Sequence, residues 1–280
     1  MPKIEVNESL FFKMLGKTYD YGRLEEILTS AKAELDEPPD SSQPDDKRLI
    51  KIELNDTNRP DLWSTAGLTR LLRIHAGGAS NGEKYGSFLS SKEKLVQNGE
   101  RVLKVSPELK DIRPYAAGFV ISGKPIDEAM LSDIIQTQEK LCGNFGRKRK
   151  SVSMGVYRSA MIHWPVLYKG ADPDTTCFVP LDGEKMLSCR NILKEHPKGI
   201  EYGGIIAGQK LFPVLEDAAG EILSMPPVIN SATIGAVKTG DTDLFVEFTG
   251  TDLVSVMLSA SIVACDFFDF GFEILPVKTE

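Results

Sequence analysis

Three polar residues have the types and positions that could support chemistry: Ser224, Glu247 and Thr249. They lie at or near the ends of short apolar segments within residues 212 to 252, FPVLEDAAGEILSMPPVINSATIGAVKTGDTDLFVEFTGTD. A few polar groups on an otherwise apolar frame are what a small-molecule pocket needs. Serine and threonine at strand ends also commonly satisfy backbone groups. This pattern alone therefore leaves both interpretations open.

Glu247 is the most informative of the three because apolar residues flank it on both sides. If Phe245 and Glu247 face the same side of a strand, the carboxyl group lies beside an aromatic ring. In such a partly apolar site its pKa rises, and it can hydrogen-bond a hydroxyl group. In the alternative arrangement Glu247 faces solvent, and the core face is formed by Leu244, Val246 and Phe248. The alternation of the strand is compatible with both.

A run of four cations follows a predicted helix: Arg147, Lys148, Arg149 and Lys150. Cations in a loop stay exposed and can contact phosphates. A simple solvated charge run is equally compatible with the pattern. The formal net charge of −7 argues against a chain that coats nucleic acid by bulk charge, but it is compatible with a local basic patch.

Several other kinds of site lack their sequence patterns. The four cysteines are widely spaced without a C-x-x-C pair, and the three histidines show no ligand spacing, so we predict neither a zinc site nor a His-based triad. Free buried thiols in a reducing compartment are expected instead. The common phosphate-loop, dinucleotide and nucleophile-elbow motifs are absent as well.

Composition indicates a protein with real hydrophobic cores and no membrane span. The chain has 280 residues, of which 41% are hydrophobic, and this length allows about one to three domains. It contains no run of about 18 apolar residues. The first residues, MPKIEVNESLFF, do not resemble a secretory signal.

Residues 1 to 78 are predicted to form a compact module in the order strand, helix, helix, strand, helix. Asn7 can cap the first helix, and Pro60 suits the first position of the third, which Gly77 and Gly78 end. A polar, Pro-rich segment at 37 to 47 reads as a mobile loop. The predicted strands are 3 to 6 and 49 to 54, and the helices carry the apolar positions 10 to 15, 24 to 31 and 62 to 72.

Residues 79 to 94 are predicted to be a connector, and residues 95 to 280 a second, larger domain. Its strands and helices mix without a regular βαβ period, so the fold class is α+β. Thr251 or Asp252 can cap its last helix. Predicted strands are 102–105, 116–122, 152–157, 176–180, 212–215, 222–225, 244–248 and 272–275; predicted helices are 126–141, 187–195 (ended by Pro197 and Gly199) and 253–265.

Several segments resemble the β chain of phenylalanyl-tRNA synthetases, in its archaeal/eukaryal form. The segment LNDTNRPDLWSTAGLTRLLR is similar to the N-R-x-D-L-x-x-x-x-G-L-x-R pattern of that chain's N-terminal module. Further similar segments are IRPYAAGFVISG, IQTQEKLCGNFGRKRKSVSMGV, ILKEHPKGIEYGGII, FPVLEDAAGEILSMPPVIN and LFVEFTGTD. The resemblance spans nearly the whole chain in the right order, but only the N-terminal half of the family's β chain. We therefore expect a fragment of a longer β chain.

This resemblance implies a role in a cytoplasmic synthetase of the form (αβ)₂. In that family the α subunit aminoacylates tRNA(Phe) with ATP and magnesium, and no cofactor is expected in the N-terminal half of the β chain. The β chain carries an α+β editing domain that hydrolyses tyrosine misattached to tRNA(Phe). That domain would begin at Leu95, and residues 1 to 78 would be the small module before it.

The resemblance also implies four pocket residues: Leu215, Ser224, Glu247 and Thr249. Glu247 stands where relatives have Asp. Leu215 would pack on the tyrosyl ring, Glu247 would recognise the tyrosyl moiety with Ser224 or Thr249, and Ser224 or Thr249 would hold the attacking water. No activated nucleophile is visible, so no covalent intermediate is expected. The four consecutive cations would hold the acceptor stem or the 3′ end of the tRNA.

One segment departs from the family. Relatives read G-x-H-D-L-D where residues 155 to 160 of this chain read GVYRSA. This departure and the glutamate at position 247 favour an alternative, a tRNA-binding and subunit-assembly scaffold without editing. A third hypothesis is a free-standing deacylase, against which the N-terminal module argues because family members keep it within the synthetase.

Overall fold

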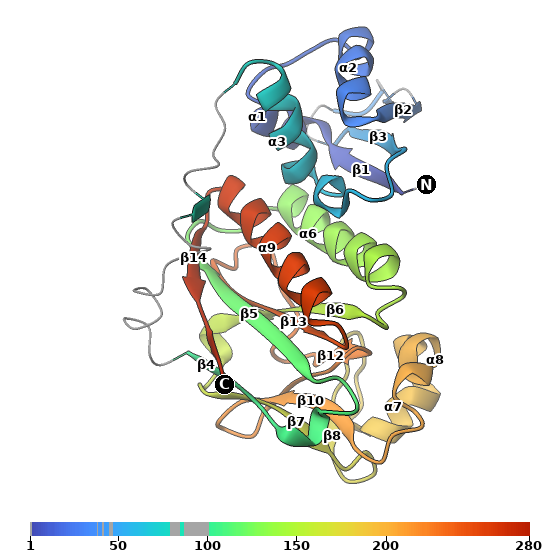
Figure 1. Ribbon diagram of the computed structural model, residues 1–280, viewed down its shortest axis with the longest axis vertical. Coiled ribbons are helices and arrows are strands. Elements are labelled where there is room, and N and C mark those ends of the chain that lie inside the picture. Colours follow the sequence, from blue (N-terminus) through green and yellow to red (C-terminus); the bar gives the residue numbers. More distant parts are fainter. Residues whose placement is uncertain (1, 38, 41, 45–46, 79–84, 87–100) are drawn as a thin grey trace.

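The computed structural model describes residues 2–37, 39–40, 42–44, 47–78, 85–86 and 101–280. Most of the predicted connector at 79 to 94 therefore lies outside the described residues. The fold is α+β, as predicted from the mixed order of strands and helices. Figure 1 shows a small N-terminal module beside a larger body that contains the remaining sheets.

The N-terminal module is a three-stranded antiparallel sheet covered by helices. Its strands β1 (Lys3–Asn7), β2 (Ala33–Glu37) and β3 (Leu49–Leu54) pair in the order β1-β3-β2. Its helices are α1 (Glu8–Leu15), α2 (Tyr21–Leu28) and α3 (Thr65–His75). The side chain of Asn7 accepts a hydrogen bond from the backbone N–H of Leu10, which confirms the predicted cap.

Two sequence predictions for this module were wrong. Strand β2 was missed because its sequence, AELDE, is short and mostly acidic, and acidic residues are depleted in strands. The third helix does not begin at Pro60, which instead opens a single 3₁₀ turn, Pro60–Leu62. Helix α3 begins only at Thr65, since the Ser64 side chain accepts from the backbone N–H of Gly67 and caps it there.

The larger body is built on two sheets packed face to face, with helices on both outer faces. One sheet is antiparallel, in the order β14 (Glu273–Pro276), β5 (Tyr115–Ser122), β13 (Asp243–Gly250), β6 (Val152–Arg158). Helices α6 (Glu128–Lys140) and α9 (Leu253–Asp269) cover its outer face through one apolar cluster. Its inner face contributes Val120, Tyr157 and Phe245 to the core between the sheets.

The second sheet supplies the other wall of this core. Its order is β12 (Ile229–Asn230), β11 (Ile222–Met225), β10 (Phe212–Glu216), β7 (Val166–Ala171), β4 (Val102–Val105), β15 (Lys278–Thr279). Strand β4 runs parallel to both its neighbours, and the other pairs are antiparallel. The far face of this sheet packs in one cluster with α7 (Cys189–Glu195).

Some element boundaries in the larger body also differ from the prediction. Strand β7 was not predicted, and 176 to 180 shortens to β8 (Cys177–Phe178), which pairs with β9 (Leu187–Ser188). Pro197 does not end the preceding helix but begins α8 (Pro197–Tyr202), because proline suits the first position of a helix. Helix α9 continues beyond Cys265 to Asp269.

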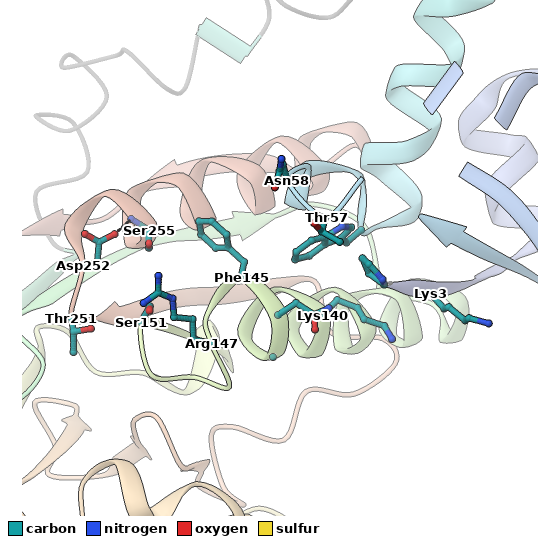
Figure 2. Close-up of a pocket in the computed structure, with 14 residues that line it drawn as sticks. Lys3, Thr57, Asn58, Lys140, Phe145, Arg147, Ser151, Thr251, Asp252 and Ser255 are labelled. Carbon is teal, nitrogen blue, oxygen red and sulfur yellow. Dashed lines mark hydrogen bonds between the residues drawn. The ribbon is translucent and has the colours of Figure 1, made fainter. Parts of the chain in front are cut away.

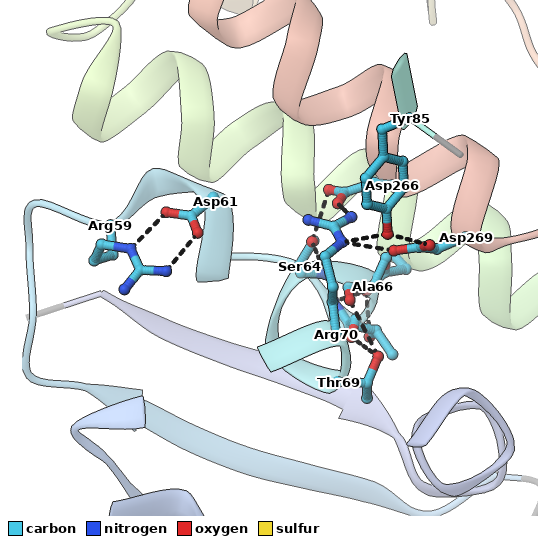
Figure 3. Close-up of polar contacts among 12 residues, drawn as sticks. Arg59, Asp61, Ser64, Ala66, Thr69, Arg70, Tyr85, Asp266 and Asp269 are labelled. Atoms are coloured by element: carbon cyan, nitrogen blue, oxygen red, sulfur yellow. Dashed lines mark hydrogen bonds and ion pairs between the residues drawn. The ribbon is translucent and has the colours of Figure 1, made fainter. Parts of the chain in front are cut away.

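A polar network joins the N-terminal module to α9 (Figure 3). Arg70 of α3 pairs with Asp266 at 2.7 Å and with Asp269 at 2.6 Å, and the Ser64 hydroxyl donates to Asp266. Nearby, the Thr65 hydroxyl donates to the buried Asp133 of α6. The module is thus joined to the larger body by buried charged groups, beside apolar contacts of Leu10 and Ala66.

Candidate functional site

A cavity of about 440 Å³ opens beside the edge of the antiparallel sheet. Its wall is formed by α6, β6 and residues 224 to 238, and it includes Ser224 and Glu247. Much of the remaining wall is apolar, with contributions from Leu131, Ile134, Met154, Val156, Pro226 and Val237. Ligand pockets are typically of this size and are lined in this way.

Glu247 faces the interior and not the solvent. Leu244, Val246 and Phe248 point toward the helices, so Glu247 and Phe245 share the face that lies between the two sheets. The first of the two predicted arrangements is therefore correct, and the side chain is only 1% exposed.

The electrostatic environment of Glu247 is dominated by burial. Burial raises the pKa of its carboxyl group to about 7, although the Tyr157 hydroxyl, the Arg113 guanidinium and the Thr249 hydroxyl favour the charged form. Its Oε2 atom lies 2.9 Å from the Tyr157 hydroxyl. Its Oε1 atom is buried and has no hydrogen-bond partner among the described residues. A group that titrates near neutral pH in a cavity wall is a candidate functional residue.

Ser224 and Leu215 lie opposite each other on β11 and β10. The Ser224 side chain is buried, lines the cavity and approaches the Tyr157 hydroxyl to 2.8 Å. Leu215 is fully buried in the core between the sheets, in the same apolar cluster as Tyr157 and Phe245. The structure thus brings Ser224 and Glu247 together and places Leu215 behind the wall.

Thr249 also lies behind the cavity wall, where a buried arginine holds it. Its hydroxyl accepts a hydrogen bond from Arg113 Nε at 3.0 Å and lies 3.1 Å from Ser153 Oγ. Arg113 also donates to Ser153 and to the backbone carbonyls of Arg149 and Lys150. It is only 1% exposed, and burial lowers its pKa.

Sequence reasoning missed the role of Arg113. The residue stood inside one of the family-like segments, IRPYAAGFVISG, but no local pattern marks it as buried. Long-range contacts alone show that it joins β13, β6 and the basic turn that follows α6.

Tyr157 is the second residue that sequence reasoning did not assign to the site. It was noted only as part of the departing segment GVYRSA, yet its hydroxyl lies between Glu247 and Ser224. A hydroxyl has one proton, and an ionised carboxylate is the stronger acceptor. Tyr157 then donates to Glu247, and Ser224 donates to the tyrosine oxygen. Burial raises the pKa of Tyr157 well above 10, so the phenol keeps its proton.

The four consecutive cations do not form one surface. Arg147, Lys148 and Lys150 are exposed, whereas Arg149 is half-buried. The Arg149 guanidinium donates to the carbonyls of Pro227 and Val228 and stacks 4.0 Å over the Tyr202 ring. Arg149 therefore lines the cavity, and the other three remain available to a partner.

A second, larger hollow lies between the N-terminal module and α9. Figure 2 shows this groove of about 1380 Å³, whose basic lining residues are Lys3, Lys140 and Arg147. Asp252 and Ser255 line it at the start of α9. Among the four predicted pocket residues, none lines this groove, so it is distinct from the cavity beside Glu247.

The described residues hold no group of three or more His, Cys, Asp or Glu side chains that could bind a metal ion. Within the same part of the chain, no helix is long and apolar enough to cross a membrane. All four cysteines are free, but Cys177 is exposed, which corrects the expectation that all the thiols are buried.

Comparisons with known proteins agree with this fold. Residues 1–78 match the family described as the Phe-tRNA synthetase beta subunit B1 domain. The phenylalanine–tRNA ligase beta subunit of Treponema pallidum is 45% identical over 309 residues, which covers 99% of this chain and 51% of that protein. The subunit of Borrelia hermsii is 48% identical over 279 residues, which covers 100% of this chain and 48% of that protein. The chain thus spans about half the length of these curated relatives.

A solved structure covers the whole chain. It is an N-terminal fragment of the phenylalanyl-tRNA synthetase beta subunit from Pyrococcus horikoshii, with a TM-score of 0.86 and 32% identity over 100% of this chain and 77% of that one. Fold and matches together define the class of protein, a part of an aminoacyl-tRNA synthetase. The chain belongs to the phenylalanyl-tRNA synthetase β-subunit family. The family expected from the sequence segments is thereby confirmed, but its archaeal/eukaryal form is not, because the two curated relatives are bacterial.

Proposed function

We propose that this part of the β subunit hydrolyses tyrosyl-tRNA(Phe) and so removes tyrosine attached in error. The observation that supports this most strongly is the buried carboxyl group of Glu247 in the wall of a cavity of about 440 Å³. Tyrosine differs from phenylalanine by one hydroxyl group, so a second site is useful if it demands that hydroxyl.

Glu247 and Ser224 are suited to make this demand. Both are buried polar groups in a largely apolar wall, and both can hydrogen-bond a phenol. A phenylalanyl ligand that displaced the Tyr157 hydroxyl would leave them unpaired, which costs about 1–3 kcal/mol for each buried group. The site would therefore prefer tyrosine because phenylalanine leaves buried polar groups without hydrogen bonds. The apolar wall would pack against the aromatic ring.

The hydrolysis itself needs little more than a positioned water molecule. The scissile bond is an ester, and holding a water molecule against its carbonyl carbon supplies much of the rate. Because the Ser224 hydroxyl is taken by the phenol at the far end of the tyrosyl group, the water falls to Thr249, which would have to leave Arg113 or Ser153 to hold it. Ser224 contacts a tyrosine and not a histidine base, so we propose no acyl-enzyme intermediate.

The remaining partners follow from the family and are also proposals. The tRNA acceptor stem would meet the exposed cations Arg147, Lys148 and Lys150. An α subunit would complete an (αβ)₂ synthetase in the cytoplasm and would carry the ATP- and magnesium-dependent aminoacylation. The likeness to an archaeal fragment over the whole chain supports an archaeal/eukaryal type of β subunit.

The test is hydrolysis of tyrosyl- and phenylalanyl-tRNA(Phe) by this chain and by the complete α/β enzyme. We expect selective loss of the tyrosyl ester, at least tenfold slower with Glu247→Ala. The matched control is Glu221→Ala, an exposed glutamate, which should leave the rate unchanged. Trapping an acyl group on Ser224 would contradict the water-mediated route.

A scaffold without editing is the second candidate function. It is favoured by one observation, the Tyr157 hydroxyl that already contacts both Glu247 and Ser224. If the chain and the complete enzyme both leave tyrosyl-tRNA(Phe) intact, the scaffold replaces the editing proposal. Hydrolysis by the complete enzyme alone would mean that the isolated chain lacks tRNA contacts.

A further inference from the structure

The groups proposed to recognise a tyrosyl ligand are already occupied by a tyrosine of the chain itself. The Tyr157 hydroxyl lies 2.8 Å from Ser224 Oγ and 2.9 Å from Glu247 Oε2. Its side chain is completely buried. A ligand phenol in the same orientation would need the same two partners.

The pairing of β6 with β13 places this phenol. Tyr157 lies opposite Phe245, and Gly155 lies opposite Glu247, two residues back along β6 and two residues further along β13. The Tyr157 ring packs against Phe245 with centroids 5.8 Å apart. Its hydroxyl end fits over Gly155, where a Cβ atom would clash with the hydroxyl oxygen and come within 2.6 Å of Glu247 Oε2. The contact between the Tyr157 hydroxyl and Glu247 therefore requires glycine at position 155.

The other oxygen of Glu247 offers no second route to the carboxyl group. Oε1 is buried and has no hydrogen-bond partner among the described residues. Oε1 is thus covered, and the position between Oε2 and Ser224 Oγ is taken by the Tyr157 hydroxyl. A ligand hydroxyl that contacts both groups in this position requires Tyr157 to move.

We propose that Tyr157 is an internal competitor that keeps the tyrosyl-recognition site closed until a ligand phenol replaces it. This inference rests on the proposed function, because it assumes that Glu247 and Ser224 recognise the ligand. An incoming phenol remakes the two contacts that Tyr157 gives up. The apparent affinity equals the intrinsic affinity multiplied by the fraction of molecules in which Tyr157 has left the site. This reduction applies to every ligand of the site.

The test is binding of L-tyrosine amide and L-phenylalanine amide, measured by calorimetry on this chain. Removing the competitor with Tyr157→Ala should tighten binding of tyrosine amide at least tenfold relative to the unmodified chain. Adding Glu247→Gln to that variant should reduce its preference for tyrosine amide over phenylalanine amide. Unchanged or weaker binding of tyrosine amide to Tyr157→Ala would overturn the proposal, since Tyr157 would then support the ligand.

Two further variants separate the ring from the hydroxyl. Tyr157→Leu keeps apolar packing against Phe245 and should also tighten binding of tyrosine amide. It replaces the alanine variant if that variant does not fold. Tyr157→Phe keeps the ring but frees Glu247 and Ser224, so it should tighten binding of tyrosine amide by less than Tyr157→Ala does. Weaker binding of tyrosine amide to Tyr157→Phe would overturn the proposal, because the hydroxyl would then support the ligand.

The unmodified chain offers a direct measurement. In protein labelled with 3-fluorotyrosine, the resonance of Tyr157 is identified by its loss in Tyr157→Phe. Saturating tyrosine amide should shift that resonance, and binding without a shift would overturn the proposal. None of these measurements requires hydrolysis. If tyrosyl-tRNA(Phe) is not hydrolysed but Tyr157→Ala binds tyrosine amide more tightly, only the editing function is refuted. If the ester is hydrolysed but Tyr157→Ala shows no tighter binding, only the role of Tyr157 as a competitor is refuted.

Discussion

At the scale of single residues, burial and the polar partners of Glu247 favour opposite charge states of its carboxyl group. Burial raises its pKa from the ordinary 4.5 to about 7, against the effects of Tyr157, Arg113 and Thr249. In the pH range between these values the folded protein holds a proton that the unfolded chain releases. The free energy of unfolding therefore falls as the pH rises through this range.

Replacement by glutamine should remove this dependence. From about pH 4.5 to pH 7, the unmodified chain should lose about 3 kcal/mol of stability more than Glu247→Gln does, and the difference should level off above pH 7. Urea unfolding at a series of pH values measures it. The exposed Glu221→Gln should keep the slope of the unmodified chain. Parallel curves for all three proteins would mean that Glu247 stays ionised throughout.

At the scale of elements, β13 and α9 form the frame of the site. Strand β13 lies between β5 and β6 and carries Glu247 and Thr249 on its inner face. The chain then turns directly into α9, whose cap is Asp252 and not Thr251. The Asp252 side chain accepts from the backbone N–H of Ser255 at 2.8 Å, whereas the Thr251 hydroxyl donates to the Lys150 carbonyl at 3.3 Å.

The two residues that sequence reasoning left as alternative caps should therefore differ in their effect on stability. Asp252→Ala should lower the free energy of unfolding by about 1 kcal/mol, because it removes the cap and an anion from the first turn of α9. Thr251→Ala, in the same turn, should cost less than about half of that. Chemical denaturation compares them. A larger loss for Thr251→Ala would contradict the assignment of the cap.

The turn after α6 calls for a comparison between Lys148 and Arg149. Lys148 is exposed, but Arg149 holds the carbonyls of Pro227 and Val228. Lys148→Ala should weaken tRNA(Phe) binding and reduce the slope of log K against log salt by about 1, as for the loss of one phosphate contact. Arg149→Ala should mainly destabilise the fold. The exposed Lys185→Ala is the control for total charge; equal salt slopes for Lys148→Ala and Lys185→Ala would remove the turn from the tRNA interface.

At the scale of the whole molecule, buried charges hold the N-terminal module on the larger body (Figure 3). Arg70 is the cation of this contact and faces two carboxylates of α9. Burial raises the pKa of Asp266 to about 7 and that of Asp133 to about 6. Burying these charged groups costs desolvation free energy, so removing Arg70 leaves the buried carboxylates uncompensated.

Loss of Arg70 should show whether the module folds as a domain of its own. Arg70→Met leaves Asp266 and Asp269 without their cation and should cost about 3–5 kcal/mol. Arg23→Met breaks only an exposed pair with Glu26 and should cost less than about 1 kcal/mol. If residues 1 to 78 form a separate domain, Arg70→Met should also split urea unfolding into two steps. A single, equally cooperative transition would contradict that division.

Much of the fold could be predicted because local patterns determine local structure. Alternating apolar residues identified β3, a run of strand formers identified β13, and the side chain of Asn7 marked the start of α1. The missed elements β2 and β7 have patterns that are weak without their neighbours. Pro197 was assigned to the wrong end of a helix, since proline follows a helix as readily as it begins one.

The sequence by itself determined the family and the α+β class. It also determined that Glu247 and Phe245, two positions apart on a strand, lie on the same face. Only the tertiary structure decided that this face is interior, because both faces of β13 are covered and alternation cannot distinguish two buried sides. It also brought Arg113 to Thr249 and Tyr157 to Ser224, contacts that span 136 and 67 positions of the chain. Such contacts depend on how distant strands pair and pack, and no local spacing encodes them.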